Sequence, residues 1–162
     1  MFSARFGFGL EEGAPAMEVR RRVFVEERGV PAMEEFDDFD AIAAHLLVWD
    51  EEKAQPIAAG RMYPLHGDIC IGNIAVTPAY RGQMFDDLAL RALLNRVDGL
   101  PGARVLFSAD AHEQLMLRPF GFTEAGETSF SRGAQRKTMA VDRDKILWDS
   151  PCKHSKAPDK KA

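Results

Sequence analysis

Hydrophobic residues recur with two different spacings along this chain of 162 residues. Runs that alternate apolar with polar residues, or are apolar throughout, predict β-strands, whereas apolar residues at steps of three and four predict amphipathic helices. We expect strands near residues 2–8, 42–49, 56–63, 69–76, 103–109, 121–130 and 134–142. We expect helices near residues 15–28, 83–98 and 111–117. Strands that alternate with helices in this way are typical of an α/β or α+β domain built on one sheet.

Glycine and proline sharpen two of these boundaries. The sequence His66-Gly67-Asp68 predicts the hairpin between the third and fourth strands, because glycine readily adopts the conformation of a tight turn. Pro119 limits the helix that begins near Ala111, since a proline inside a helix removes a donor and clashes with the preceding turn. That helix should therefore be short.

The stretch from Asn73 to Asp87 joins a predicted strand to a predicted helix through the turn Tyr80-Arg81-Gly82. The first backbone N–H groups of a helix have no intrahelical partner, and the helix macrodipole is positive there, so a phosphate finds both donors and a favourable field. A strand, a glycine-containing turn and a helix are common in α/β proteins, so this feature alone is weak support for phosphate binding.

Further short motifs, which stand in a fixed order along the chain, help to interpret this segment. They stand in the order Val23 to Pro31 (VFVEERGVP), Asp37 to Asp40 (DDFD), Ala44 to Leu46 (AHL), Ala58 to Arg61 (AAGR), Ile74 to Val76 (IAV), Tyr80 to Gln83 (YRGQ), Phe107 to Ala109 (FSA) and Gly121-Phe122, with Gly133 and Met139 after them. This ordered set resembles the GCN5-related N-acetyltransferase (GNAT) family, and the resemblance covers roughly residues 2 to 143 without obvious large insertions.

The resemblance implies a single-domain acyl-CoA N-acyltransferase (GNAT) fold of the α/β (α+β) class, with a mixed, mostly antiparallel sheet of six to seven strands and flanking helices. We place this domain at residues 1–145 and a polar, flexible tail at residues 146–162. The family uses acetyl-CoA as co-substrate, with the pantetheine arm along the fourth strand and the diphosphate on the following loop. The positions that correspond to this binding site are Ile74, Ala75, Val76, Arg81, Gly82, Gln83, Met84, Phe85, Asp86 and Asp87.

Two loop positions depart from the family pattern, because its two later small residues, usually glycines, are replaced by Met84 and Asp86. Glycine allows a diphosphate to approach the backbone closely. Met84 can still offer its N–H if its conformation is helical, but its side chain must point away from the ligand. The carboxylates of Asp86 and Asp87 interact favourably with the positive N-terminal end of the helix when no ligand is bound. A phosphate would bind at the same positive end, so the carboxylates compete with it. A carboxylate about 5 Å from a phosphate costs roughly 3 kcal/mol at an effective dielectric near 20, around a hundredfold in affinity. We expect weakened CoA binding, with helix stabilisation as the simpler reason for both carboxylates.

A third departure lies in the short helix after the fifth strand. Eight residues after its final Ala109 the family has a tyrosine that protonates the departing thiolate, and this chain has Leu117 instead. Leucine has no exchangeable proton, so the resemblance implies slower chemistry at this step.

Two residues are candidates for the general base, Glu27 at the end of the first helix and His112 just after the fifth strand. Glu26 and His45 are further candidates. His45 lies within an apolar strand and is expected to be packed. No serine or cysteine is arranged with a histidine as a nucleophile.

Clustered charges allow two interpretations each. The acidic stretch from Glu34 to Asp40 could steer an amine substrate, but a solvated acidic loop is the commoner meaning of such a run. The basic run Arg20-Arg21-Arg22 is expected to be a solvated helix face that pairs with Glu18 or Glu26. The acidic stretch lacks a calcium-loop pattern, so we expect no metal site.

Composition limits the partners. The formal net charge of −4 argues against nucleic acid or an anionic membrane as the main partner. No apolar run reaches the ~18 to 20 residues that cross a bilayer, and no signal peptide is visible. Two cysteines, Cys70 and Cys152, make a disulfide framework unexpected, so a reducing cytoplasm is the default location.

These observations favour an N-acetyltransferase that moves an acetyl group from acetyl-CoA to a primary amine of a small molecule or peptide. Attack would be direct, within a ternary complex, with solvent or Glu27 as base and without a metal. The alternative is a catalytically degenerate GNAT-fold protein that acts as a ligand-binding or dimer-forming module. Such a dimer would be a homodimer. A third option is an enzyme that uses a less anionic ligand in the same cleft.

Overall fold

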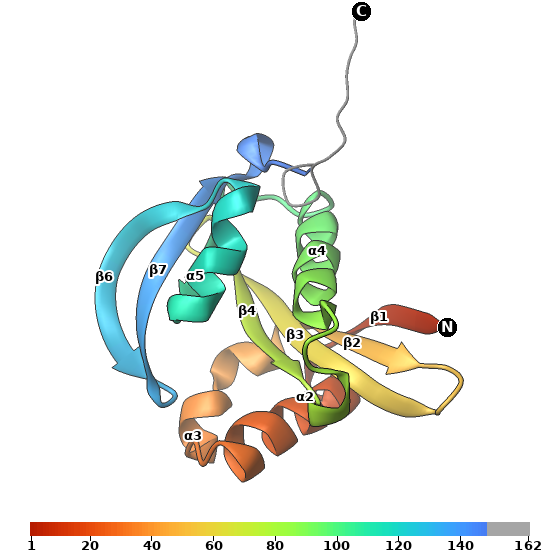
Figure 1. Ribbon diagram of the computed structural model, residues 1–162. Coiled ribbons are helices and arrows are strands. Elements are labelled where there is room, and N and C mark those ends of the chain that lie inside the picture. The colour runs from red at the N-terminus through yellow and green to blue at the C-terminus, as the bar shows by residue number, and fades with distance from the viewer. Residues whose placement is uncertain (149–162) are drawn as a thin grey trace, which may run out of the picture.

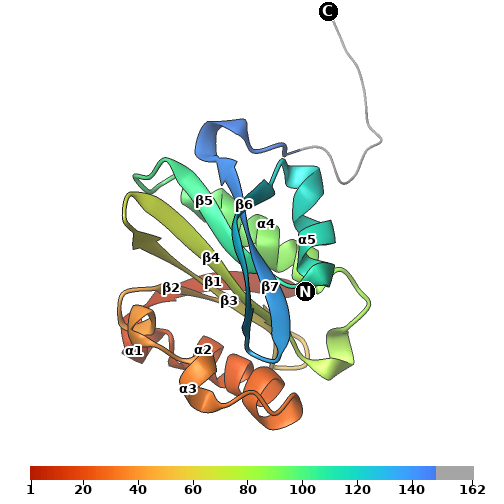
Figure 2. The same ribbon diagram turned by 90° about the vertical axis from the view of Figure 1, so that its left-hand side faces the viewer.

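The computed structural model describes residues 1–148, which form one sheet with helices on both faces (Figures 1 and 2). Seven strands lie in the order β1-β2-β3-β4-β5-β7-β6, and every neighbouring pair is antiparallel except β4 and β5. Their bounds are β1 Phe2–Phe8, β2 Ala44–Asp50, β3 Gln55–Leu65, β4 Asp68–Val76, β5 Arg104–Ala109, β6 Thr123–Ser131 and β7 Ala134–Asp142. The mixed, mostly antiparallel sheet expected from the sequence is confirmed, and each strand lies close to its predicted range.

The helices differ more from expectation. Their bounds are α1 Gly9–Glu12, α2 Ala14–Arg20, α3 Ala32–Glu35, α4 Phe85–Val97 and α5 Ala111–Leu117, with a π-helical segment Arg21–Glu27 and short 3₁₀ segments Asp38–Ala41, Pro78–Tyr80, Arg118–Phe120 and Arg143–Lys145. The single helix predicted at residues 15–28 is therefore wrong in detail. Pro15 occupies the first turn of α2, a position that suits proline, and the chain widens into a π-helix after Arg20.

Two hydrophobic clusters pack on opposite faces of the sheet. The larger one contains Leu46, Ala58 and Ile74 and packs against α4, whereas the smaller one contains their chain neighbours Leu47, Ala59 and Ala75 and packs against α2 and the π-helical segment. Adjacent residues of a strand point to opposite faces, so each central strand contributes to both clusters. Figure 2 shows α1, α2 and α3 on one side of the sheet and α4 and α5 on the other.

The hairpin between β3 and β4 has the conformation that its sequence predicts. Leu65 pairs with Asp68 across a two-residue turn, and both turn residues have positive φ, 50° at His66 and 84° at Gly67. Two successive residues with positive φ match the right-handed twist of the flanking strands.

Strands β4 and β5 separate after a short contact. Their parallel pairing is limited to Ile69 with Val105 and Cys70 with Leu106. Beyond Cys70 the edge of β4 that faces β5 is no longer paired with it. This separation leaves backbone groups of β4 available to a ligand.

A β-bulge interrupts β4 within the separated part. Ala59 pairs with Ala75 and Arg61 with Gly72, so two residues of β4, Asn73 and Ile74, stand opposite one residue of β3. Asn73 takes a positive φ of 52°, which asparagine tolerates better than most residues.

Buried ion pairs join the helical face to the sheet beside this bulge. Arg20 donates from Nε to Glu35 Oε2 and from Nη1 to Asp40 Oδ1, each over 2.8 Å. Arg61 on β3 contacts Asp40 over 2.8 Å and Asp37 over 2.7 Å. Buried charges are stable only when they are paired, which these contacts achieve.

The network corrects two interpretations of the sequence. The acidic stretch is solvated only in part, because Glu34, Asp37 and Asp38 are exposed whereas Glu35 and Asp40 are buried and neutralised by arginines. Arg20 is likewise buried, and only its neighbours Arg21 and Arg22 pair with Glu18 on the surface as predicted. Side-chain charge alone cannot distinguish these cases.

The end of the described chain extends the core beyond the predicted domain boundary. Ile146 is buried in the larger cluster and the N–H of Leu147 bonds to the carbonyl of Phe120. Cys70 is a free thiol, and Cys152 and the rest of the expected tail lie outside the described residues. No helix within residues 1–148 is long and apolar enough to cross a membrane.

Candidate active site

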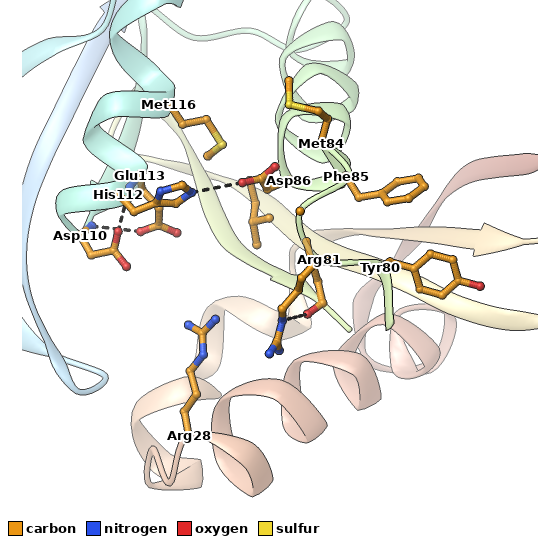
Figure 3. Close-up of a pocket in the computed structure, with 13 residues that line it drawn as sticks. Arg28, Tyr80, Arg81, Met84, Phe85, Asp86, Asp110, His112, Glu113 and Met116 are labelled. Atoms are coloured by element: carbon orange, nitrogen blue, oxygen red, sulfur yellow. Dashed lines mark hydrogen bonds and ion pairs between the residues drawn. The ribbon is translucent and has the colours of Figure 1, made fainter. Parts of the chain in front are cut away.

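A cavity of about 450 Å³ lies between α4, α5 and the diverging end of β4 (Figure 3). Seven of the ten residues predicted to bind the co-substrate line this cavity, together with the predicted base His112. The seven are Ile74, Val76, Arg81, Gly82, Met84, Phe85 and Asp86. Ala75, Gln83, Asp87 and the other predicted base, Glu27, do not line it. The structure thus places most of the predicted donor-site residues around one cavity and adds His112 from a later part of the chain.

The loop before α4 has a glycine-like conformation at Met84. Met84 is left-handed, with φ 69° and ψ 20°, so the helical conformation considered from the sequence is wrong. Gly82 also has a positive φ of 77°, and a Cβ added to it would meet nothing within 4 Å. The turn therefore keeps the shape that glycines would adopt, at a steric cost for methionine of roughly 1–2 kcal/mol.

Asp86 faces the cavity from the first turn of α4. Its Oδ2 lies 3.3 Å from His112 Nε2 on α5, and Figure 3 shows this contact crossing the cavity mouth. Asp87 turns away and pairs with Arg91 over 2.8 Å. The two carboxylates therefore differ in role, because Asp87 pairs along the helix start while Asp86 carries negative charge into the cavity.

Arg81 is held by two neighbours. Its Nη1 and Nη2 contact the two carboxylate oxygens of Glu27 over 2.5 and 2.7 Å, and its Nε donates to the carbonyl of Val76. The hydrogen bond from Arg81 lowers the pKa of Glu27. Both oxygens of Glu27 are thus occupied and its basicity is reduced, which makes Glu27 a poor general base.

Tyr80 fixes the start of this loop. Its hydroxyl donates to Asp50 Oδ2 over 2.5 Å and accepts from Gln55 Nε2 over 2.8 Å. The ring also meets Phe85 edge to face at 5.6 Å. Strand β2 and the hairpin after it therefore hold the turn that precedes the candidate phosphate loop.

His112 and Leu117 mark the two ends of α5. The His112 side chain is 76% exposed, so it is accessible at the cavity mouth. Leu117 is fully buried in the larger cluster. The position that carries a tyrosine in the resembling family thus serves packing in this chain.

Five further residues of the cavity lining were not among the predicted site residues. They are Arg28 just after the π-helical segment, Tyr80 before α4, Asp110 at the N-cap of α5, and Glu113 and Met116 from α5. One signal was present in the sequence, because Asp110 and Glu113 have the spacing of a helix capping box. The structure shows this box, with the Asp110 side chain accepting from the Glu113 N–H and the Glu113 side chain accepting from the Asp110 N–H.

A second cavity, of about 360 Å³, continues along the same gap between β4 and β5. Its lining includes Cys70 to Asn73 of β4 and Leu106 to Ser108 of β5, whereas the first cavity begins at Ile74 on β4 and at Asp110 after β5. The two cavities thus occupy successive stretches of the same two strands.

The second cavity is polar but holds no activated nucleophile. Burial raises the pKa of the Cys70 thiol, so the thiol stays protonated at neutral pH. Burial also raises the pKa of Tyr63 to about 12. Within residues 1–148, no group of three or more His, Cys, Asp or Glu side chains is placed to hold a metal ion.

Comparisons with known proteins agree with this geometry. A family model described as the acetyltransferase (GNAT) domain matches residues 19–97. The uncharacterized N-acetyltransferase YjcF of Bacillus subtilis is 35% identical over 83 residues, which are 51% of this chain and 58% of that protein. The chain thus spans little more than half the length of this curated relative.

Solved structures match over a larger part of the chain. An acyl-CoA N-acyltransferase from Pseudomonas aeruginosa is 26% identical with a TM-score of 0.70, covering 86% of this chain and 97% of that one. A GNAT family acetyltransferase from Elizabethkingia anophelis, solved with acetyl-CoA bound, is 14% identical with a TM-score of 0.64, covering 87% and 97%. The latter likeness concerns the fold alone.

Proposed function

We propose that this chain, whose fold and sequence match the GNAT acetyltransferase family, transfers an acetyl group from acetyl-CoA to a primary amine of a small molecule or peptide. The observation that carries the proposal is the separation of β4 from β5 after Cys70, with a cavity on each stretch of the gap. An acyl donor and an acceptor can meet there without either blocking the other.

The first cavity suits the pantetheine arm and thioester of the donor. The stretch of β4 at Ile74, Ala75 and Val76 is unpaired with β5, and its free backbone groups can bond to an extended amide-containing chain as a neighbouring strand would. The Val76 carbonyl is not one of them, because it already accepts from Arg81 Nε. Arg81, Gly82, Gln83 and Met84 form the turn at the diphosphate end, with Phe85, Asp86 and Asp87 at the helix start that follows. The glycine-like turn supports binding there, whereas the Asp86 carboxylate opposes it. We therefore infer that acetyl-CoA binds with reduced affinity.

The acceptor would enter through the second cavity. Its amine nitrogen would reach the acyl carbon where the two cavities meet, beside the β4 bulge at Asn73 and Ile74. The nitrogen forms a bond to that carbon, the carbon–sulfur bond breaks, and the amine loses one proton. Because Leu117 cannot donate a proton, the thiolate leaves without help from that position.

Calorimetric titration with acetyl-CoA at low and moderate salt tests the donor half of this proposal. We expect binding that weakens as salt rises, because the diphosphate contributes through charge. The double variant Met84→Gly with Asp86→Gly should bind more tightly than the wild type. Release of free thiol from acetyl-CoA in the presence of a panel of primary amines then tests transfer.

The outcomes distinguish an acetyltransferase from a protein that only binds the ligand. Binding together with amine-dependent thiol release supports the acetyltransferase. Tighter binding by the double variant without thiol release from either protein would indicate a protein that binds ligand but has lost transfer. Absence of binding at millimolar acetyl-CoA would exclude this donor.

A further inference from the structure

Glu113, like Asp110, is a carboxylate of the first cavity that takes no part in the mechanism described above. It lies in the first turn of α5, which begins directly after β5 at the point where β5 has separated from β4. Figure 3 shows its side chain beside Asp110 and His112 on the α5 wall of the cavity. Its side chain is 12% exposed, so it is largely shielded from bulk water.

The two oxygens of Glu113 have different surroundings. Oε1 accepts from the backbone N–H of Asp110 over 3.0 Å and from Arg136 Nη1 over 3.1 Å. Oε2 has no hydrogen-bond partner among the described residues. The fully buried side-chain atoms without a partner are His45 Nδ1 and Arg61 Nε, and Glu113 Oε2 is not among them, so it is not fully buried. Oε1 thus anchors the carboxylate while Oε2 stays accessible.

Arg136 connects Glu113 to the second cavity. The Arg136 side chain is 3% exposed, and it donates from Nε to the carbonyl of Ser131 and from Nη1 to that of Ser108 over 3.0 and 3.5 Å. Ser108 and Ser131 both line the second cavity. Arg136 thus connects Glu113, on the wall of the first cavity, to the backbone of two residues that line the second cavity.

The environment of Glu113 also favours proton uptake. Burial is the main cause that raises its pKa, and the charge of Asp110 adds to it. The Asp110 N–H and the charges of Arg136 and Arg132 oppose the increase without cancelling it. Other charged or titratable side chains of the cavity lining include Arg28, Arg81, Asp86 and His112. Arg81 is paired with Glu27, and His112 is directed toward Asp86. A carboxylate with a raised pKa accepts a proton near neutral pH better than an exposed one does.

We propose that Glu113 is the proton acceptor of the transfer reaction, through its Oε2 atom. This assignment rests on the proposed function. As the amine nitrogen bonds to the acyl carbon and the carbon–sulfur bond breaks, the electron pair of that bond goes to sulfur and the nitrogen passes one proton to Oε2. The same proton then goes to the thiolate or to water, which returns Glu113 to its carboxylate form and balances the reaction.

The competing explanation is that Glu113 only caps α5. Glutamine serves a capping box as well as glutamate does, and its side-chain oxygen can still accept from the Asp110 N–H. Glu113→Gln therefore removes the proton acceptor while it keeps the cap. Glu127→Gln, on the exposed edge strand β6, makes the same chemical change away from both cavities and is the matched control.

The test compares wild type, Glu113→Gln and Glu127→Gln by thiol release from acetyl-CoA with ethanolamine, spermidine and glycinamide as acceptors, across pH. We expect Glu113→Gln to lower kcat/KM by about 10²–10⁴-fold, with little change in the affinity for acetyl-CoA measured by calorimetry or in the thermal unfolding midpoint. The wild-type rate should increase with pH through a limb whose midpoint matches the Glu113 pKa measured by NMR, and this limb should be absent in Glu113→Gln.

The possible results distinguish the role of Glu113 from the proposed function of the protein. Amine-dependent turnover by Glu113→Gln at the wild-type rate, with the same pH limb, would overturn the assignment to Glu113 while leaving the proposed function intact. A wild type that binds acetyl-CoA but acetylates none of the amines would overturn both. A loss of activity that is accompanied by a lower unfolding midpoint would assign Glu113 to capping alone.

Discussion

The side-chain amide of Asn73 donates a hydrogen bond to the buried carboxylate of Glu35 over 2.9 Å. This contact joins the bulge of β4, where the two cavities meet, to α3 on the opposite face of the sheet. The same carboxylate accepts from Arg20 and from Arg132. The buried ion pairs thus support the backbone at the centre of the candidate site.

Replacement of Asn73 should separate its two roles. Asn73→Ala removes the bond to Glu35, at about 1–3 kcal/mol, and places alanine at positive φ, at roughly 1–2 kcal/mol more. Asn73→Gly removes only the bond, so we expect it to destabilise the protein less than Asn73→Ala does. Urea unfolding measures both, and equal losses would show that the backbone conformation carries no strain.

Arg20 and Arg22 should differ in their contribution to stability although they are two residues apart. Arg20→Ala leaves Glu35 and Asp40 buried with fewer partners, and removal of one member of such a network costs about 3–5 kcal/mol. Arg22→Ala removes a surface pair with Glu18, which is worth at most ~1 kcal/mol. Similar unfolding free energies for the two variants would mean that the Arg20 network adds nothing to stability.

Asp86→Asn should strengthen acetyl-CoA binding by up to about a hundredfold at low salt, because it removes a charge beside the proposed diphosphate position. Asp86 is 37% exposed, so solvent screens part of this repulsion and the gain should shrink as salt rises. Asp87→Asn is the matched control, since Asp87 is paired with Arg91 and does not line the cavity. Calorimetry on both variants should give the larger gain for Asp86→Asn, and the reverse order would place the diphosphate elsewhere.

His45 should make the protein less stable in mild acid. It is buried, its Nε2 donates to the carbonyl of Asp40, and burial lowers its pKa. The unfolded chain, with a histidine pKa near 6.5, then binds more protons than the folded one, so stability is full above about pH 6.5 and falls as pH drops below it. His45→Gln keeps a donor for Asp40 but cannot titrate. Unfolding midpoints at pH 7.5 and 5.5 should therefore converge in this variant, and an unchanged pH effect would assign it to other groups.

Strand positions and the candidate donor site were predictable from the sequence because each depends on residues that are close together in the chain. Alternating apolar residues define β4, and the turn from Tyr80 to Met84 follows it directly. The left-handed conformation of Met84 was not predictable, since a non-glycine residue at positive φ is unusual and local propensity argues against it.

By itself the sequence determined the seven strands, the family resemblance and most of the residues of one loop that lines the first cavity. Tertiary structure alone decided which charges are buried and which oxygens stay free. Arg20 and Arg22 are equivalent in any reading of local charge, and only packing against α3 and the sheet pairs Arg20 with Glu35 and Asp40. Glu113 likewise appears in the sequence as a helix cap. Its connection to the second cavity follows from Arg136 on β7, a strand 23 residues away in the chain, because long-range contacts depend on the whole fold.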